Sequence, residues 1–384
     1  MIRKGTSLLI LLLMFFPGKV LAGENVPCPV GEAAVLMDVH NGQALYGKNM
    51  HKQMYPASTT KILTAILALE KGRLYKLVAI PGEACRVDGT ALGLRVGERL
   101  TLRDLLYALL MASANDVSVA IADHIAGSVE NFAGLMNEKA KSLGATDSHF
   151  TNPHGLPDPD HYSGAYDLAL IARYAMQNTT FREIVKTRFK VISRPGFPQE
   201  QLWNHNRLLE RYQGATGIKT GYTVAAGQCL VASAQRNGRE LIAVVLNSQG
   251  EAIYEDAGKL LDYGFDDFFP VQVVKKGEKI ATAKVPGGEP GEVVLLAGDD
   301  FWYDFPKSGS PNLSRRLQLV REIQAPLSAG QKVGKLDIYN GEQKVGTVDL
   351  VVAGNVGQKP DRTWLFWLAG VALLVLGGIM QEIF

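Results

Sequence analysis

The chain has 384 residues, 47% of them hydrophobic, which suits two domains with appended segments and a sizeable buried core. Its formal net charge is only +2, and it contains no long basic run. Nucleic acid is therefore excluded as an expected partner, because its binding requires a basic patch or stripe.

Residues 1–22 have the pattern of a secretory signal peptide. Arg3 and Lys4 form a charged start, residues 8–16 form an apolar run, and Ala22 ends a small-residue cleavage site. The apolar run is too short to span a bilayer comfortably, so we expect removal rather than anchoring. No cysteine follows Ala22 directly, so a lipid-anchored form is not expected.

The segment up to about residue 180 predicts a strand pair followed by helices. Residues 33–49 contain Asn41-Gly42, a hairpin turn signal that predicts two short strands. Thr101, with Asp104 three residues later, resembles a capping box and predicts a helix start. Apolar spacing predicts the remaining helices, at 58–71, 117–126, 129–143 and 166–177, with a turn-rich segment at 152–164.

The apolar periodicity changes at Thr216. Runs on both sides of the Asn237-Gly238 turn predict antiparallel strands, and a closing helix is expected to end near Phe265. Strands at both ends with helices between them predict a mixed α/β domain with an antiparallel sheet over residues 25–265.

Residues 268–354 have a different pattern. Short alternating runs such as "GEVVLL", "KLDIYN" and "GTVDLVV" are separated by Gly, Pro and Asp turns. This pattern predicts a small all-β domain, and residues 355–362 are expected to form a linker after it.

A second apolar segment lies at 363–380 and contains no charged residue. As a helix it would be roughly 25 Å long and apolar on every side, which favours a membrane-anchoring helix. Trp364 and Trp367 suit the membrane interface, whereas Lys359 and Arg362 on the expected outer side oppose the positive-inside rule. Anchoring is expected, and the topology stays open.

The three cysteines are Cys28, Cys85 and Cys229. In an exported protein they allow at most one disulfide, and their spacing matches neither a metal site nor a redox motif. We expect them to be small buried residues without a chemical role.

Ser58-Thr-Thr-Lys61 is the only Ser-x-x-Lys in the chain. On a helix, residues three apart share a face, so the ammonium of Lys61 would lie near the hydroxyl of Ser58. A lysine whose pKa is lowered by burial and by nearby positive charge can take the proton of a serine nucleophile. The alternative is an ordinary helix cap followed by a solvated lysine.

Two further motifs are weak when taken singly. Ser113-Ala114-Asn115 lies at the end of a predicted helix, but Ser310-Pro311-Asn312 also fits its pattern. Lys219-Thr220-Gly221 opens a predicted strand, and its glycine allows another backbone to come close. An isolated motif of this kind favours an exposed strand with a charged edge residue.

Together, in this order, the three motifs form the set described for penicillin-binding proteins and β-lactamases. The surrounding sequence closely resembles the low-molecular-mass penicillin-binding proteins, the serine D-alanyl-D-alanine carboxypeptidases. The likeness runs from about residue 33 to residue 265, and the β domain and anchor match the layout of that family. The matching stretches are "PASTTKILTA", "NPHGL", "HYSGAYDLALIARYA", "NHNRLL" and "GIKTGYT".

The resemblance implies a β-lactamase/D,D-peptidase-like domain, with an antiparallel sheet, helices on both faces and a helical subdomain. It also implies the catalytic roles. Ser58 would attack the carbonyl between the two terminal D-alanines of a peptidoglycan stem peptide, and Lys61 would accept its proton. The backbone N–H groups of Ser58 and Tyr222 would hold the oxyanion, and Ser113 would pass the proton to the leaving D-alanine. No cofactor or metal is implied.

The same resemblance implies the substrate contacts. Asn115 would bind the peptide backbone of the substrate, while Lys219 and Thr220, with Gly221, would face its free carboxylate. The strand after Lys219 can add an extended peptide to the sheet edge. β-Lactams should acylate Ser58 and leave slowly. The expected location is the outer face of the bacterial cytoplasmic membrane.

Two positions depart from relatives in the family. Tyr222 stands where some relatives carry histidine, but the expected contact there comes from the backbone. Residues 247–259 contain no arginine, whereas some relatives have one that helps to hold the carboxylate. The second difference affects the expected carboxylate anchoring, not the acylation chemistry.

Other functions fit part of this pattern. A β-lactamase of class A would deacylate through a glutamate, but the one Glu-x-x-x-Asn between the second and third motifs, at Glu200 and Asn204, comes too late in the chain. A penicillin-sensing or wall-binding protein would keep Ser58 without turnover, which the complete motifs oppose.

A metallo-carboxypeptidase is the third alternative. His149, His154 and His161 lie close together in the sequence, but no His-Glu-x-x-His helix exists. His154 belongs to the "NPHGL" segment, where a structural hydrogen bond is expected rather than metal ligation.

Overall fold

The computed structural model describes residues 26–196, 198–319 and 323–360. The predicted signal peptide at 1–22 and anchoring helix at 363–380 lie outside these residues. Within the described residues, no helix combines the length and apolar character that crossing a membrane requires.

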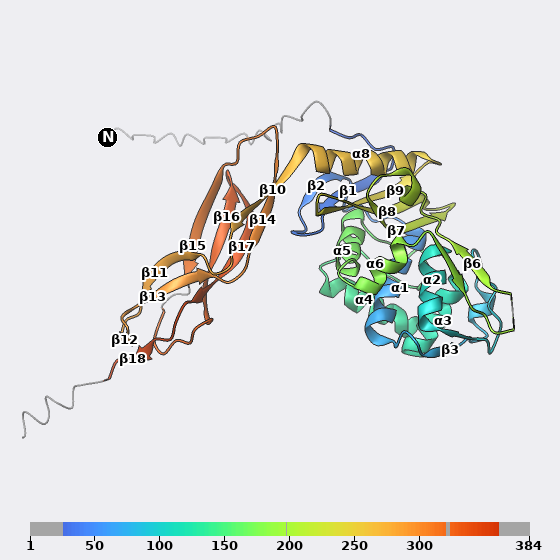
Figure 1. Cartoon of the computed structure of the whole chain (residues 1–384), viewed down its shortest axis with the longest axis horizontal. Helices are drawn as coiled ribbons and strands as arrows, with labels where there is room; N and C mark the ends of the chain where they lie inside the picture. The colour runs from blue at the N-terminus through green and yellow to red at the C-terminus, as the bar shows by residue number, and fades with distance from the viewer. Residues whose placement is uncertain (1–25, 197, 320–322, 361–384) are drawn as a thin grey trace, which may run out of the picture.

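The first domain is built on a five-stranded antiparallel sheet with strand order β2-β1-β9-β8-β7 (Figure 1). β7 is therefore an edge strand. The strands are β1 (Ala33–Asp38), β2 (Ala44–Lys48), β7 (Ala215–Thr223), β8 (Gly227–Arg236) and β9 (Arg239–Ser248). Asn41-Gly42 lies in the five-residue connection between β1 and β2, and Asn237-Gly238 forms the two-residue turn between β8 and β9, so both turn signals mark hairpin connections.

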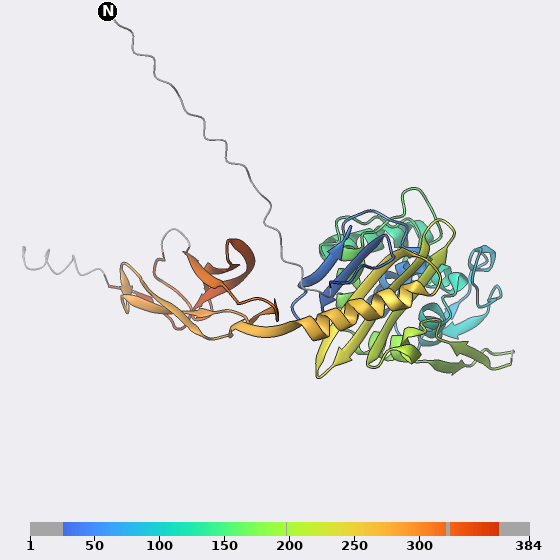
Figure 2. The same cartoon turned by 90° about the horizontal axis from the view of Figure 1, so that it is seen from above.

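Both faces of this sheet are covered by helices (Figures 1 and 2). On β1, Ala33, Val35 and Met37 pack into the core beneath the helical subdomain, whereas Ala34 and Leu36 pack toward α8. Burial on both faces explains why the central strands are nearly continuous apolar runs. The helices are α1 (Lys61–Lys71), α2 (Leu102–Met111), α3 (Asn115–Ala126), α4 (Val129–Ser142), α5 (Ala165–Ala175), α6 (Thr179–Lys186), α7 (Leu208–Arg211) and α8 (Ala252–Asp267).

Side-chain caps fix several of the helix starts. The hydroxyl of Thr101 accepts from Asp104 N at 3.1 Å and donates to the Asp104 carboxylate, so the predicted cap is present. Ser128 and Asn178 cap α4 and α6 in the same way. The observed starts of α2 and α4 lie within two residues of the starts predicted from the sequence.

The helix predicted over 58–71 begins differently. Ala57–Thr60 form a 3₁₀ turn, η1, and α1 starts only at Lys61. Ala57 has a positive φ of 48°, which tightens the chain before the helix. Ser58 therefore lies on a short turn ahead of α1, not in its first turn.

Short elements pack against helices α2 and α3. They are the ribbon of β3 (Leu77–Ala79) and β4 (Arg99–Thr101), the hairpin of β5 (Phe189–Ile192) and β6 (Glu200–Trp203), and the 3₁₀ turn η2 (Ala84–Arg86). The sequence did not predict these pairs, because each strand has only three or four residues.

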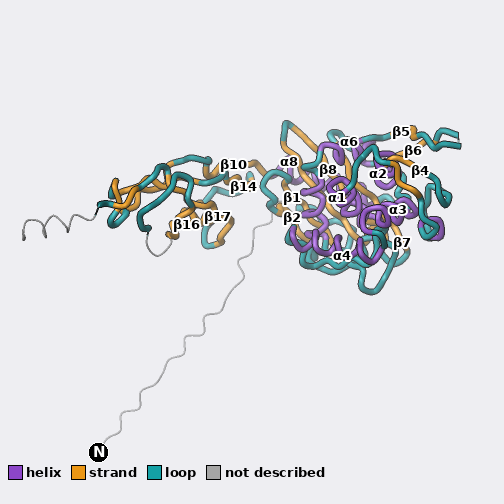
Figure 3. Tube along the Cα trace, turned by 90° about the horizontal axis from the view of Figure 1, so that it is seen from below, coloured by secondary structure: helices purple, strands orange, loops and turns teal. Residues whose placement is uncertain are grey.

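Residues 268–360 form the all-β domain that the sequence predicted, and Figure 3 shows strands and loops but no helix in this part of the described chain. A five-stranded sheet has the order β11-β13-β17-β16-β15, and two-stranded ribbons pair β10 with β14 and β12 with β18. The strands are β10 (Phe268–Val274), β11 (Lys279–Lys284), β12 (Gly288–Glu289), β13 (Glu292–Ala297), β14 (Phe301–Pro306), β15 (Leu313–Leu319), β16 (Lys332–Asn340), β17 (Gln343–Val352) and β18 (Gly357–Gln358). β18 lies inside the segment predicted as a linker.

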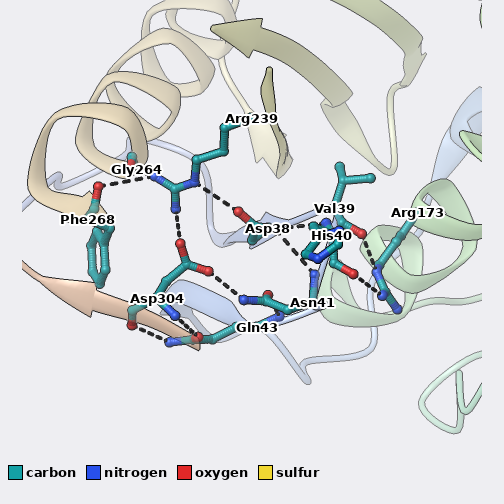
Figure 4. A network of polar contacts seen from close by, with 10 residues as sticks. All are labelled: Asp38, Val39, His40, Asn41, Gln43, Arg173, Arg239, Gly264, Phe268 and Asp304. Carbon is teal, nitrogen blue, oxygen red and sulfur yellow. Dashed lines mark hydrogen bonds and ion pairs between the residues drawn. The ribbon is translucent and has the colours of Figure 1, made fainter. Parts of the chain in front are cut away.

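One buried carboxylate joins the two domains (Figure 4). Asp304 of β14 is fully buried and lies 2.5 Å from the guanidinium of Arg239, which also bonds Asp38 at 2.9 Å. Its second carboxylate oxygen accepts from Asn41 Nδ2 at 2.7 Å. The Gln43 amide bonds both backbone groups of Asp304, at 2.8 and 3.0 Å. Every polar group of this residue is thus satisfied by the first domain.

We predict that Asp304→Asn will lower the free energy of unfolding by about 3 kcal/mol, because it breaks a buried, hydrogen-bonded ion pair. Differential scanning calorimetry of the full chain should also show the two domains unfolding less cooperatively. The matched control is Asp299→Asn, which removes an exposed ion pair with Lys276 and should cost less than about 1 kcal/mol. Equal losses in both variants would contradict the prediction.

Candidate active site

The turn η1 and the start of α1 bring the first motif together. Lys61 is fully buried, and its Nζ donates to Ser58 Oγ at 2.9 Å. The same ammonium donates to Asn115 Oδ1 and to the carbonyl oxygen of His154, each at 2.7 Å. All three N–H donors of Lys61 are therefore used, and one of them points at the predicted nucleophile.

The environment of Lys61 favours its neutral form. Burial lowers the pKa of Lys61 well below its usual value, and the nearby charge of Lys219 lowers it further, while Asp116 acts in the opposite direction. A neutral lysine has a lone pair, which would face the hydroxyl of Ser58 at the observed distance. The pair then has the arrangement of a nucleophile with its general base.

The second motif lies in the connection between α2 and α3. Ser113 has a positive φ of 62°, and Asn115 is the first residue of α3. Asn115 accepts from Lys61 and donates through Nδ2 to Asp88 O at 2.7 Å. Ser113 is 7% exposed and lies in the segment leading to Asn115. The alternative motif, Ser310 to Asn312, lies between β14 and β15 in the other domain.

The third motif lies on the edge strand β7. Lys219 is 1% exposed, its Nζ donates to Thr220 O at 2.9 Å, and burial lowers its pKa to about 7. The side chain of Lys219 is close enough to Lys61 for the two charges to interact. Lys61, Asn115 and Lys219, one residue from each of the three motifs, therefore lie together.

Gly221 allows β7 to lie directly against η1. A Cβ atom on Gly221 would lie 2.8 Å from Ser58 N and 3.0 Å from Ala57 Cβ. Such distances exclude a side chain unless one of the two backbones shifts. The backbone N–H of Ser58 thus lies beside the segment that continues into Tyr222, the other predicted oxyanion donor.

A loop that no sequence pattern indicated packs over the second motif. Residues 88–94 accept from Asn115 through Asp88 O, and two of their N–H groups, at Leu92 and Leu94, donate to the carboxylate of Asp116 at 3.0 Å. From the other side, the buried Arg194 donates to two carbonyl groups of the loop and to Glu98. The only sequence feature that relates to this loop is Asp116, an acidic residue in the first turn of α3.

Residues 247–259, where some relatives carry an arginine, have the carboxylate of Glu251. Glu251 forms ion pairs with Arg207, at 3.0 Å, and with Arg211. Near the third motif, His205 has a pKa that is lowered by burial and by Lys219. His205 lies within the "NHNRLL" stretch, but no pattern in the sequence indicated a role for it.

The glutamate and histidines considered for other reactions have structural partners. Glu200 pairs with Arg194 at 3.1 Å. His154 Nδ1 accepts from Leu156 N at 3.2 Å, which agrees with the predicted structural hydrogen bond. Among the described residues, no three side chains of His, Cys, Asp or Glu form a group suited to a metal ion.

The cysteines are free thiols, and the prediction that all are buried is wrong for two of them. Cys229 is buried on β8, and burial raises the pKa of its thiol to about 12. Cys28 and Cys85 are exposed, because they lie in the segment before β1 and in the short turn η2.

The fold and the three converging motifs define a serine-type peptidase of the β-lactamase/D,D-peptidase class, followed by an all-β domain. Residues 25–250, more than half of the chain, match the family model described as D-alanyl-D-alanine carboxypeptidase. Residues 268–358 match the model of the penicillin-binding protein 5 C-terminal domain. The chain therefore belongs to the D-alanyl-D-alanine carboxypeptidase family and is a serine-type D-alanyl-D-alanine carboxypeptidase, as the resemblance implied.

Similar proteins cover both domains. The chain is 34% identical to the D-alanyl-D-alanine carboxypeptidase DacD of Salmonella typhimurium over 85% of this chain and 86% of that protein. It is 34% identical to DacF of Bacillus subtilis over 79% of this chain and 80% of that protein. The solved structure of penicillin binding protein 5 from Haemophilus influenzae has a TM-score of 0.77 and 31% identity, covering 88% of this chain and all of that chain.

We predict that Gly221→Ala will slow D-alanine release from a pentapeptide by about 100-fold, because the added methyl group displaces η1 from β7 by up to an ångström. Steady-state kinetics of the purified variant measures this loss. The control is Gly134→Ala, where an added Cβ meets no atom within 4 Å in the middle of α4. Its activity should equal that of the wild type, and a similar loss in both variants would refute the prediction.

Proposed function

We propose that the enzyme removes the terminal D-alanine from peptidoglycan stem pentapeptides through an acyl-enzyme on Ser58. The observation that carries the proposal is the 2.9 Å contact between Lys61 Nζ and Ser58 Oγ in a buried site that lowers the pKa of Lys61. The family supports the substrate class, and its members include proteins named as penicillin-binding.

In the acylation step, Ser58 Oγ attacks the carbonyl carbon between the two D-alanines and gives its proton to Lys61 Nζ. The oxyanion is held by the N–H groups of Ser58 and Tyr222, which flank the close approach at Gly221. When the C–N bond breaks, Lys61 gives this proton to Ser113, which passes its own hydroxyl proton to the amine of the leaving D-alanine, so that Lys61 is neutral again.

In the deacylation step, water adds to the ester carbonyl of the acyl-enzyme. Lys61 takes a proton from this water and returns it to Ser58 Oγ when the ester bond breaks. The products are the shortened stem peptide with a free carboxylate and the restored serine hydroxyl. β-Lactams would form the same ester bond and leave slowly.

The substrate would be held on two sides. Its free carboxylate would face Lys219 and Thr220. Burial alone lowers the pKa of Lys219 to about 7, and the bound carboxylate would raise it and so stabilise the cation. The peptide backbone would extend along the open edge of β7 and bond Asn115. Removal of the terminal D-alanine would consume the donor used for cross-linking, so the enzyme would limit cross-links during cell-wall biogenesis.

We predict that a labelled penicillin will modify Ser58 and that Ser58→Ala will lower D-alanine release by at least about 10³-fold, since the nucleophile is lost. Mass spectrometry of the digested adduct identifies the labelled residue. The matched control is Ser310→Ala in the alternative Ser-x-Asn motif, which should keep full activity. A label on another residue would overturn the site assignment, and rapid penicillin turnover would favour a β-lactamase instead.

We also propose that the enzyme is exported and held at the outer face of the cytoplasmic membrane by residues 363–380. A chain ending at residue 360 should then fractionate with soluble protein, whereas the full chain should sediment with membranes. Both forms should release D-alanine at the same rate, because the described site lies within residues 26–267. Membrane sedimentation of the shortened chain would refute anchoring by the tail.

A further inference from the structure

The buried imidazole of His161 contacts Thr60, the last residue of the turn η1 that carries Ser58, directly before Lys61 at the start of helix α1. Its Nε2 lies 2.9 Å from Thr60 Oγ1, and its Nδ1 lies 3.1 Å from Thr151 N. A backbone N–H can only donate, so Nδ1 is the acceptor and Nε2 carries the proton. His161 therefore donates to the hydroxyl of Thr60, which lies between the nucleophile and the base in the sequence.

The hydroxyl of Thr60 bonds His161 and does not cap α1. Thr60 directly precedes α1, but it is also the last residue of η1 and has helical backbone angles, whereas a capping threonine has extended ones. Here its side chain makes no such cap bond, and it is completely buried. The start of α1 is instead tied to His161, which comes 101 residues later in the chain.

The ring of His161 is held in one orientation and one protonation state. Burial lowers its pKa to about 4, although Asp158 acts in the opposite direction, so the ring is neutral at neutral pH. Phe150 packs edge-on against it with ring centroids 5.5 Å apart. One nitrogen thus remains an acceptor and the other a donor throughout the range in which the enzyme would work.

The segment before His161 also contacts the same turn. His154 O accepts from Lys61 Nζ at 2.7 Å. At Gly155, which has a positive φ of 87°, an added Cβ would lie only 1.9 Å from Ala57 O. The segment is therefore in direct contact with the backbone of η1, and a movement of either one would displace the other.

We propose that His161 is a positioning residue for acylation: by holding Thr60, it keeps Ser58 Oγ and Lys61 Nζ within hydrogen-bond distance. The inference rests on the proposed function, because it concerns the same acylation step. His161 itself touches neither of these two reacting groups. It acts through Thr60 and through the segment that supplies His154 O.

The test compares His161→Leu with His161→Gln in the full-length chain. Leucine removes the donor to Thr60, whereas the amide nitrogen of glutamine can take the place of Nε2. Stopped-flow acylation by a fluorescent penicillin should be 10- to 100-fold slower in His161→Leu, and His161→Gln should recover most of the rate. The loss should fall on the acylation rate constant, with little change in the concentration of penicillin that gives half-saturation.

Variants at Thr60 test the contact from its other side. Thr60→Val removes the acceptor at nearly constant volume and should slow acylation as much as His161→Leu, while Thr60→Ser should not. The double variant of valine and leucine should be no slower than either single variant. If His161→Leu does not fold, Thr60→Val and His161→Gln still decide the question.

His149→Leu is the matched control. His149 lies in the same loop and bonds Asp160 O through Nδ1, but it is exposed. Its variant should acylate at the rate of the wild type. A slow His149→Leu would mean that general loosening of the loop explains the effect, and would overturn the proposal.

A pH profile separates positioning from a loss of stability. Burial is the largest cause of the lowered pKa of Lys61, with Lys219 second and Asp116 opposing. If His161→Leu loosens the segment and admits water, the rising limb of the acylation rate should move to higher pH. A lower population of folded enzyme would reduce the rate equally at every pH.

Two outcomes would refute the inference directly. These are acylation of His161→Leu at the wild-type rate, and a His161→Gln variant as slow as His161→Leu. Failure of the wild-type chain to be acylated on Ser58 would instead overturn the proposed function, and this inference with it. The two failures are therefore distinguishable.

Discussion

The active site depends on one electrostatic constraint, which is that two lysines are buried in the same small volume. Lys61 and Lys219 are 0% and 1% exposed; burial lowers the pKa of both, and the charge of Lys219 lowers the pKa of Lys61 further. Two ammonium groups at such a site are unfavourable, so at least one is driven toward its neutral form. The neighbouring histidines add no further positive charge, because burial, together with the charge of Lys61, lowers the pKa values of both His154 and His161. A base and a cation can then coexist at the same pH.

The backbone brings the two lysines together through close approaches that only glycine permits. Gly221 lets the edge strand β7 contact η1, and Gly155 lets the 152–161 segment contact it from another direction. The turn that carries Ser58 is thus enclosed by two elements that are distant in sequence. Glycine at these two positions therefore permits the geometry in which the candidate catalytic side chains lie.

Much of this arrangement could be predicted from the sequence, but only where the signal was local or belonged to a known set. The Asn-Gly turns, the Thr101 cap and the three motifs were readable, and the order of the motifs led to the family. The contacts of Arg194 with Glu98 and of Arg239 with Asp304 join residues 96 and 65 positions apart. No periodicity or spacing encodes such pairs, because the fold alone brings them together. The exposed cysteines were mispredicted for a related reason, since a residue type indicates an average burial and not a position.

The burial of Asp304 at the domain junction affects which substrates the active site could contact. Asp304 makes hydrogen bonds to the first domain through both its carboxylate and its backbone, which restricts rotation of the two domains about their junction. The β domain would therefore act as a rigid spacer and not as a flexible linker. A flexible linker would instead let the active site move to many heights and directions around the proposed anchor. With the anchor proposed at residues 363–380, a rigid junction would hold the active site at a nearly constant height above the membrane, and the stem peptides within reach would be those in one layer of the wall.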